Sequence, residues 1–190
     1  MITSIPNLLT LSRILVLPAL ILTFYFESPT ANWWALGLFV AASITDFFDG
    51  YLARRRGEMS NLGRFLDPIA DKLLVGVALI MIAAFDRIDS ISLIAAVIIL
   101  SREILVSGLR EFLAELKVSV PVTQLAKWKT GVQMTAIGFL LAGTAANPIP
   151  AEIIGTIGLW IAAMLTLYTG YDYLKAGVRH LTADEQEPGA

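Results

Sequence analysis

The sequence predicts an all-α polytopic membrane protein with six transmembrane helices and both termini in the cytoplasm. Hydrophobic residues make up 56% of the 190 residues and charged residues only 16%, whereas a soluble domain carries roughly a quarter charged residues. Too few charges are present to cover a water-facing surface. Six apolar stretches also come close to the roughly 20 helical residues that cross a bilayer.

The six stretches are 8–26, 33–52, 69–85, 91–112, 132–146 and 153–174. Segments rich in Pro, Gly, Asn, Asp and Ser separate them, as expected for turns. No linker, repeat or low-complexity segment divides the chain. We therefore expect one six-helix domain over 1–180 and a short cytoplasmic tail over 181–190.

Basic residues orient these helices. With the N-terminus in the cytoplasm, the connections at 54–63 and 117–129 and the C-terminal tail lie on the same side. Of the 14 Lys and Arg residues, Arg87 is then the one on the opposite side. The positive-inside rule favours this orientation strongly over its inverse.

Composition also excludes several kinds of site. The chain has no cysteine and a single histidine, His180, so thiolate chemistry, disulfides and histidine-based metal sites are excluded or disfavoured. The formal net charge is -2, and no basic stripe interleaved with aromatics indicates nucleic-acid binding. No positively charged segment precedes the first apolar stretch, so we expect no cleaved signal peptide. Acid–base or metal chemistry is left to carboxylates.

Carboxylates gather at one end of the second and third predicted helices. Asp46 and Asp49 are followed by Gly50 and Ala53, and offsets of three, four and seven residues place all four on one helical face. Asp67 and Asp71 lie one turn apart on the next helix. Asp67-Pro68 also has the chemistry of a helix start, with Asp as N-cap and Pro at the first position. A short loop brings the two pairs together.

Four clustered carboxylates near a membrane require compensation. Each costs about 2.5–3.5 kcal/mol at mid-bilayer, and like charges repel. Oxygen ligands select hard cations such as Mg²⁺, Mn²⁺ or Ca²⁺, and four carboxylates suffice for two ions, an arrangement suited to phosphoryl chemistry. Small residues alongside leave room for a diphosphate. The alternative is helix–helix packing for the small residues and N-capping for Asp67.

The spacing Asp-x2-Asp-Gly-x2-Ala-Arg-x8-Gly-x3-Asp-x3-Asp resembles the signature of the CDP-alcohol phosphatidyltransferases, and every fixed position is filled. The resemblance covers the six-helix frame. It implies a bacterial inner-membrane enzyme with its active site facing the cytoplasm, two Mg²⁺ or Mn²⁺ ions, CDP-diacylglycerol as donor and a homodimer. It assigns metal binding to Asp46, Asp49, Asp67 and Asp71, and the general base to Asp71. It assigns contacts with the CDP moiety to Asp46, Gly50, Ala53, Arg54 and Gly63.

Three further segments resemble the bacterial branch of this family that uses glycerol 3-phosphate as acceptor and releases CMP. They begin at Ile5, Ser101 and Lys127. A phosphate-bearing acceptor calls for cations, and Arg grips phosphate bidentately. We expect the acceptor phosphate to be bound by Arg110, Lys127, Arg13 and Arg102.

Alternatives remain for this region and for the whole chain. Arg102–Glu103 and Arg110–Glu111 could be structural ion pairs, with Lys127 an interface anchor. The same chemistry could use serine, inositol phosphate or phosphatidylglycerol as acceptor. A transporter or a scaffold protein is the alternative from a different functional class. The ionisable residues of a transporter would line a path through several spans, whereas these aspartates lie at one end.

Overall fold

The computed structural model describes residues 5–26, 28–56, 61–115 and 124–184. It describes the side chains of 10–26, 28–46, 66, 68–114 and 124–175. In this part of the chain every regular element is a helix and there is no strand, which confirms the all-α prediction for it. The helices are α1 (Ile5–Thr23), α2 (Pro29–Arg56), α3 (Asn61–Ala84), α4 (Ser92–Glu115), α5 (Gln124–Ala142) and α6 (Ala151–Asp184), with a 3₁₀ turn η1 (Gly143–Ala146).

Each predicted span has its own helix, but the helix bounds differ from the predicted ones. α3 begins at Asn61 and carries Pro68 inside it, so the prediction that Asp67 caps the start of this helix was wrong. Proline has no N–H to donate to the carbonyl four residues earlier, and the helix continues through it. α5 begins at Gln124, so Lys127 lies in a helix and not in a connection. The boundary predicted at residue 180 falls inside α6.

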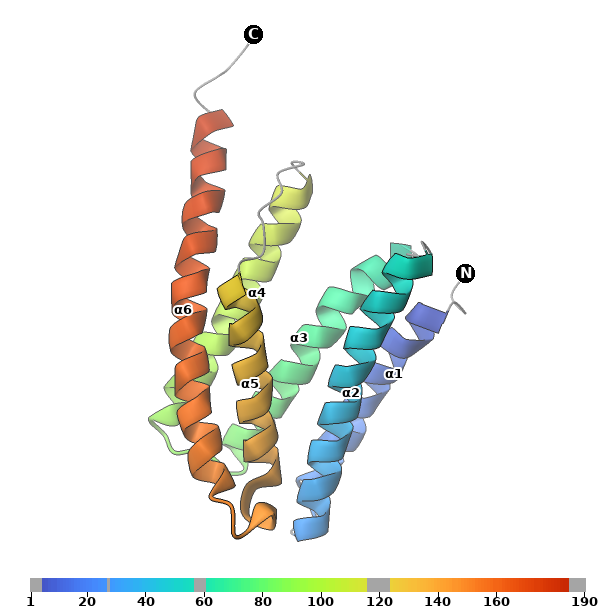
Figure 1. The fold of residues 1–190 in the computed structure, drawn as a ribbon, viewed down its shortest axis with the longest axis vertical. Coiled ribbons are helices and arrows are strands. Elements are labelled where there is room, and N and C mark those ends of the chain that lie inside the picture. Colours follow the sequence, from blue (N-terminus) through green and yellow to red (C-terminus); the bar gives the residue numbers. More distant parts are fainter. Residues whose placement is uncertain (1–4, 27, 57–60, 116–123, 185–190) are drawn as a thin grey trace.

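The six helices run alternately up and down and form two groups (Figure 1). α1 packs against α2 and α3, and α6 packs against α4 and α5. The groups meet through contacts of α2 and α3 with α5 and of α3 with α4. They converge at the end that holds the α1–α2, α3–α4 and α5–α6 connections, and they diverge toward the end where both termini lie. We call these the closed end and the open end.

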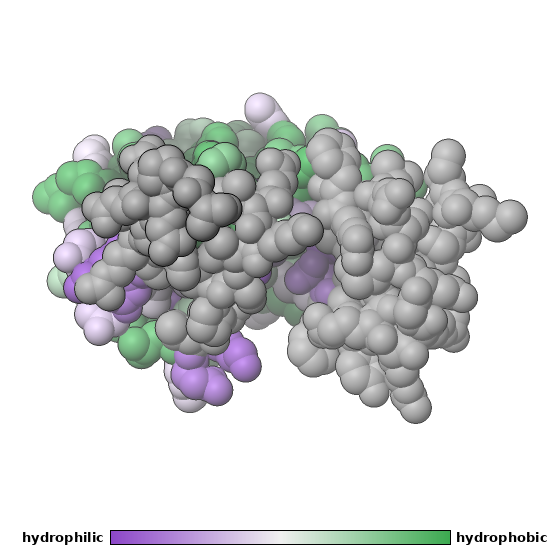
Figure 2. Space-filling model, turned by 90° about the horizontal axis from the view of Figure 1, so that it is seen from above, coloured by the Kyte–Doolittle hydropathy of each residue, from purple (hydrophilic) through white to green (hydrophobic). Residues whose placement is uncertain are grey.

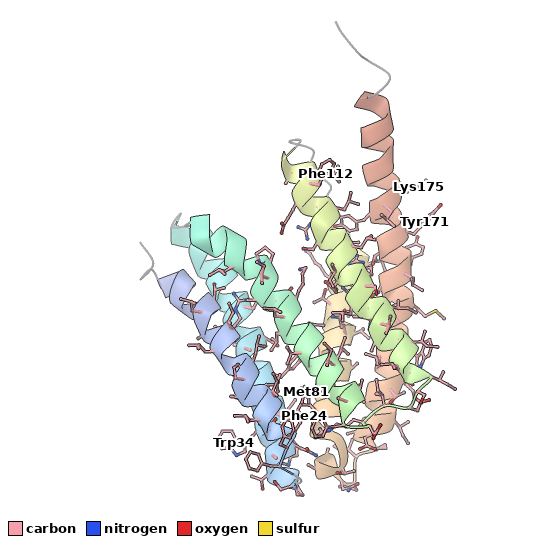
Figure 3. The ribbon with its side chains drawn as sticks, turned by 180° about the vertical axis from the view of Figure 1, so that it is seen from behind. Phe24, Trp34, Met81, Phe112, Tyr171 and Lys175 are labelled. Atoms are coloured by element: carbon pink, nitrogen blue, oxygen red, sulfur yellow. The ribbon has the colours of Figure 1, made fainter. Side chains whose placement is uncertain are left out.

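Apolar side chains hold the two groups together. Leu20 on α1, Leu79 and Ile82 on α3, and Ile137 and Leu140 on α5 are 2% exposed or less and belong to one cluster. Phe24 and Met81 extend this cluster at the closed end, whereas Phe112, Tyr171 and Lys175 lie on the diverging helices (Figure 3). Close packing near the closed end therefore leaves the open end available for a polar site.

Arg87, in the α3–α4 connection, ties the closed end together. Its guanidinium donates to the carbonyl oxygens of Leu141 at 2.7 Å and Leu140 at 3.3 Å, and to Oδ1 of Asn32 at 2.6 Å. It also lies 4.6 Å from the ring centroid of Phe24. The last carbonyls of α5 lack partners within their own helix, so Arg87 caps α5 and links it to α2 and to the turn that follows α1.

Local caps fix the neighbouring turns. Gly143 follows α5 with φ of 49°, the left-handed conformation that glycine adopts most easily after a helix. Asp89 precedes α4 and accepts a hydrogen bond from the backbone N–H of Ser92 at 3.2 Å. Hydrogen bonding to Ser92 lowers the pKa of Asp89 below its ordinary value. α4 therefore begins at a defined residue on the side opposite to the predicted site.

Two helical segments of the described chain are long and apolar enough to cross a membrane, Ser92–Ala114 and Ala151–Lys175. Thr10–Thr23 is a shorter apolar helix. Over the parts of α2 and α3 whose side chains the structure describes, neither helix meets these limits of length and hydropathy.

Candidate active site

Asp46 and Asp71 are the two predicted metal ligands whose side chains the structure describes. Asp46 lies in the C-terminal half of α2 and Asp71 in the N-terminal half of α3, both toward the open end. Their side chains are 43% and 46% exposed, and they lie within electrostatic range of one another. Two accessible carboxylates on neighbouring helices are suitable ligands for a hard cation.

The remaining residues of the signature have described backbone but side chains outside the described set. Asp49, Gly50, Ala53 and Arg54 belong to the last turns of α2, and Gly63 and Asp67 to the first turns of α3. Among the described side chains, no group of three carboxylates or imidazoles could hold a metal ion. Asp46 and Asp71 fit an oxygen-ligated cation. The side chains of the other two predicted ligands, Asp49 and Asp67, lie outside the described residues.

Arg13 forms an ion pair with Asp46 from α1. Its side chain is only 1% exposed, and it also donates to Oγ1 of Thr10 at 3.4 Å. A buried guanidinium paired with a carboxylate holds that carboxylate in one orientation. Arg13, which was predicted to bind the acceptor phosphate, therefore contacts the site through its ion pair with Asp46.

Arg102 points toward α6. Its Nη2 donates to Oγ1 of Thr169 at 3.2 Å, and its guanidinium carbon lies 5.9 Å from the ring centroid of Tyr173. A Cβ atom at Gly170 would come within 3.0 Å of Cγ of Arg102, so the absence of a side chain there gives the arginine its place. These contacts link α4 to α6.

Arg110 and Lys127 are exposed. Arg110 lies near the open end of α4, and Lys127 lies near the start of α5. The structure thus places two of the predicted phosphate ligands on the surface and two, Arg13 and Arg102, in buried or half-buried pairs.

A buried polar set between α4 and α5 was missed as a site by the sequence analysis. Lys129, 3% exposed, forms an ion pair with Glu103, 16% exposed, and lies within electrostatic range of Asp71. Gln133, one turn further along α5, is 2% exposed, and its Oε1 has no hydrogen-bond partner among the described residues. The signal in the sequence was Lys and Gln spaced four apart at the start of an apolar helix.

The site therefore combines carboxylates of α2 and α3 with buried cations of α1 and α5. Figure 2, which views the open end from above, shows hydrophilic side chains between the two groups of helices. Such a mixture can bind a metal–diphosphate and hold a second anionic substrate beside it.

Comparison with known proteins identifies this arrangement. Residues 3–168 match the CDP-alcohol phosphatidyltransferase family. The chain belongs to the CDP-alcohol phosphatidyltransferases. The family resemblance stated from the aspartate spacing is thereby confirmed.

Several similar members of the family share one name, CDP-diacylglycerol–glycerol-3-phosphate 3-phosphatidyltransferase. The protein from Rickettsia bellii is 53% identical over 91% of this chain and 94% of its own length. The proteins from Pectobacterium atrosepticum and Cereibacter sphaeroides are 42% and 40% identical, over 93% and 94% of this chain and 96% and 97% of their own lengths. This CDP-alcohol phosphatidyltransferase is thus similar to these enzymes over nearly its whole length.

Proposed function

We propose that the chain transfers the phosphatidyl group of CDP-diacylglycerol to glycerol 3-phosphate, giving phosphatidylglycerophosphate and CMP. The observation that carries the proposal is the convergence of two carboxylates and two buried cations at the open end of the bundle. These residues are Asp46, Asp71, Arg13 and Lys129. The bacterial relatives, named for this reaction, support the choice of acceptor.

In the proposed reaction Asp71 accepts the proton of an acceptor hydroxyl. The hydroxyl oxygen forms a bond to the β-phosphorus of CDP-diacylglycerol, and the bond from that phosphorus to CMP breaks. Asp46, Asp49, Asp67 and Asp71 would hold two Mg²⁺ or Mn²⁺ ions, which supply positive charge to the diphosphate and the departing CMP. Arg13 keeps the Asp46 carboxylate oriented throughout.

The cationic residues would select the acceptor. Glycerol 3-phosphate carries a phosphate in addition to its hydroxyls, and buried cations favour such an anion over serine. Arg110 and Lys127 are placed to meet it at the surface. Lys129 is placed deeper, where its ammonium lies within range of Asp71.

Membranes supplied with labelled CDP-diacylglycerol and one acceptor at a time test this proposal. We expect a lipid product and CMP with glycerol 3-phosphate, and none with serine, inositol phosphate or phosphatidylglycerol. EDTA should abolish the reaction, and Mg²⁺ or Mn²⁺ should restore it. Full turnover in EDTA would refute the role of metal, and preference for another acceptor would refute the assignment of glycerol 3-phosphate.

Asp71→Asn separates the base from the metal ligand. If Asp71 takes the proton, kcat should fall by at least about 10²–10⁴-fold, while a CDP-containing ligand still binds in the presence of Mg²⁺. If binding is lost together with turnover, Asp71 acts mainly as a metal ligand.

We further propose that all six helices cross the bacterial inner membrane, with both termini and the active site on the cytoplasmic side, and that the protein is a homodimer. Large apolar side chains are exposed on the helices, among them Leu15 at 74%, Ile80 at 57% and Met164 at 69%. Such surfaces require a lipid or protein partner. The homodimer rests on the family resemblance.

The topology can be tested with single cysteines, because the chain has none. A membrane-impermeant maleimide added to intact cells should label Ser90→Cys in the α3–α4 connection and should not label Ala183→Cys. Labelling of Ala183→Cys in intact cells would contradict cytoplasmic termini. Cross-linking of the purified protein at low concentration tests the dimer.

A further inference from the structure

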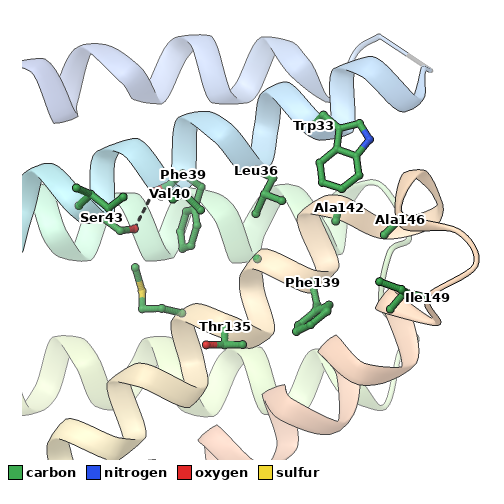
Figure 4. A pocket seen from close by; sticks show the side chains of 13 residues that line it. Trp33, Leu36, Phe39, Val40, Ser43, Thr135, Phe139, Ala142, Ala146 and Ile149 are labelled. Atoms are coloured by element: carbon green, nitrogen blue, oxygen red, sulfur yellow. Dashed lines mark hydrogen bonds between the residues drawn. The ribbon is translucent and has the colours of Figure 1, made fainter.

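A lateral groove of about 730 Å³ runs between α2 and α5, outside the polar site. Side chains of α2 form one wall, and side chains of α5 with the α5–α6 connection form the other (Figure 4). Trp33, Phe39 and Ser43 line the α2 side, and Thr135, Gly138 and Ile149 line the other side.

The wall of the groove is apolar even where its residues carry hydroxyl groups. Ser43 donates its hydroxyl to the carbonyl of Phe39 at 2.7 Å, and Thr135 donates to the carbonyl of Gly131 at 2.8 Å. Both hydroxyls therefore bond to their own helix. An occupant of this groove therefore meets mainly hydrocarbon surface.

The groove opens to the surroundings along its length. Trp33, Val40, Ile44 and Ile149 on its rim are 41–51% exposed, whereas Phe39 on its floor is 2% exposed. A chain lying in the bilayer could enter sideways without crossing the protein. Burial of the occupant would cover apolar surface that is otherwise open.

One end of the groove leads to the catalytic aspartates. Phe39, Ser43 and Asp46 are spaced four and three residues apart, so they share one face of α2. From Trp33 to Ser43 the helix rises about 15 Å at 1.5 Å per residue. This distance is half of the roughly 30 Å hydrocarbon core, which is the depth of one lipid leaflet.

The position of the groove favours one kind of occupant. A diacyl donor whose diphosphate lies at Asp46 brings its acyl chains to the Ser43 end of the groove, on the same face of α2. A volume of about 730 Å³ accommodates a hydrocarbon chain, and the apolar wall gives that chain continuous contact.

We propose that the α2–α5 groove binds an acyl chain of the diacyl donor and sets the preference for chain length. The inference rests on the proposed function, which places the donor diphosphate at Asp46. From there the chain runs past Ser43 and Phe39 toward Trp33 and passes beside Gly138 on the α5 side. Trp33 and Ile149 mark the far end, where a longer chain leaves the protein.

Gly138→Leu tests the groove. A Cβ at Gly138 would meet Cδ1 of Leu36 at 3.4 Å, an ordinary contact, so the rest of the leucine would extend into the groove. Gly37→Leu is the matched control, because Gly37 is exposed, does not line the groove and has nothing within 4 Å of its added Cβ. Phe139→Ala widens the groove and serves if Gly138→Leu fails to fold.

Turnover and binding are measured with dipalmitoyl and dihexanoyl CDP-diacylglycerol. In Gly138→Leu we expect KM and Kd for the long-chain donor to rise about tenfold, the effect of withdrawing roughly two methylene groups from apolar contact. The values for the short-chain donor and for glycerol 3-phosphate should stay within about twofold. Gly37→Leu should change none of them, and Phe139→Ala should shift the preference toward longer chains.

Equal effects on the long- and short-chain donors would overturn the proposal. Unchanged Kd values in Gly138→Leu with altered self-association would overturn it too, and would assign the face to contacts between copies. Failure of the wild type to form phosphatidylglycerophosphate would refute the proposed function instead. In that case the Kd values of the two donors still show whether the groove distinguishes acyl chains by length.

Discussion

The ion pair between Lys129 and Glu103 makes a sharp prediction about stability. Lys129 is 3% exposed and Glu103 16%, so removal of either partner leaves a charge in a poorly solvated place. Breaking such a pair costs about 3–5 kcal/mol. Glu103→Gln should lie at the upper end because it strands the more deeply buried ammonium, although Asp71 is close enough to compensate in part. Lys129→Met should lie nearer 3 kcal/mol.

The double variant Glu103→Gln/Lys129→Met completes the cycle. It leaves no stranded charge, so its loss should be smaller than the sum of the single losses, with a coupling energy toward the upper end of about 0.5–3 kcal/mol. The four tryptophans report thermal unfolding in detergent, and each kcal/mol corresponds to about 2–4 °C for a chain of this size. Additive losses, or single losses below about 1 kcal/mol as in solvated pairs, would refute this reasoning.

Two further predictions concern other cations. Arg110→Ala should raise KM for glycerol 3-phosphate by about ten- to a hundredfold, the value of a charge-assisted phosphate contact, and leave KM for CDP-diacylglycerol unchanged; equal changes in both would make Arg110 structural. Arg87→Ala should destabilise the protein by about 3 kcal/mol, since the carbonyls of Leu140 and Leu141 lose a charged donor. Arg87→Lys should recover only part of this, because an ammonium does not replace the guanidinium fork. An unchanged melting temperature in Arg87→Ala would contradict the proposed cap.

The helices could be predicted because the signals for them are local. Apolar runs of sufficient length, separated by turn residues, indicate helices without knowledge of their neighbours. The start of α3 was predicted wrongly for a related reason. Asp67-Pro68 has the local chemistry of a helix start, but the helix begins upstream at Asn61 and continues through Pro68, which these two residues alone do not indicate.

The partners of the charged residues could not be predicted from local patterns. Lys127 and Lys129 are two residues apart, which is about 200° around the helix, so only one of them can face the interior. Which one does so depends on Glu103, 26 positions away along the chain. Arg13 likewise meets Asp46 across 33 positions. The aspartates themselves were found because the spacing along each helix determines their common face.

The distribution of polar groups explains how one bundle can be rigid and reactive. At the closed end the guanidinium of Arg87 satisfies the end of α5 and links it to α2 and to the turn after α1. At the open end the carboxylates of Asp46 and Asp71 stay partly exposed, and Oε1 of Gln133 has no hydrogen-bond partner within the described residues. Polar groups that lack protein partners favour binding of charged substrates, because the substrate then supplies the missing interactions. Since the closed end fixes the helix positions, substrate binding energy need not be spent on assembling the site.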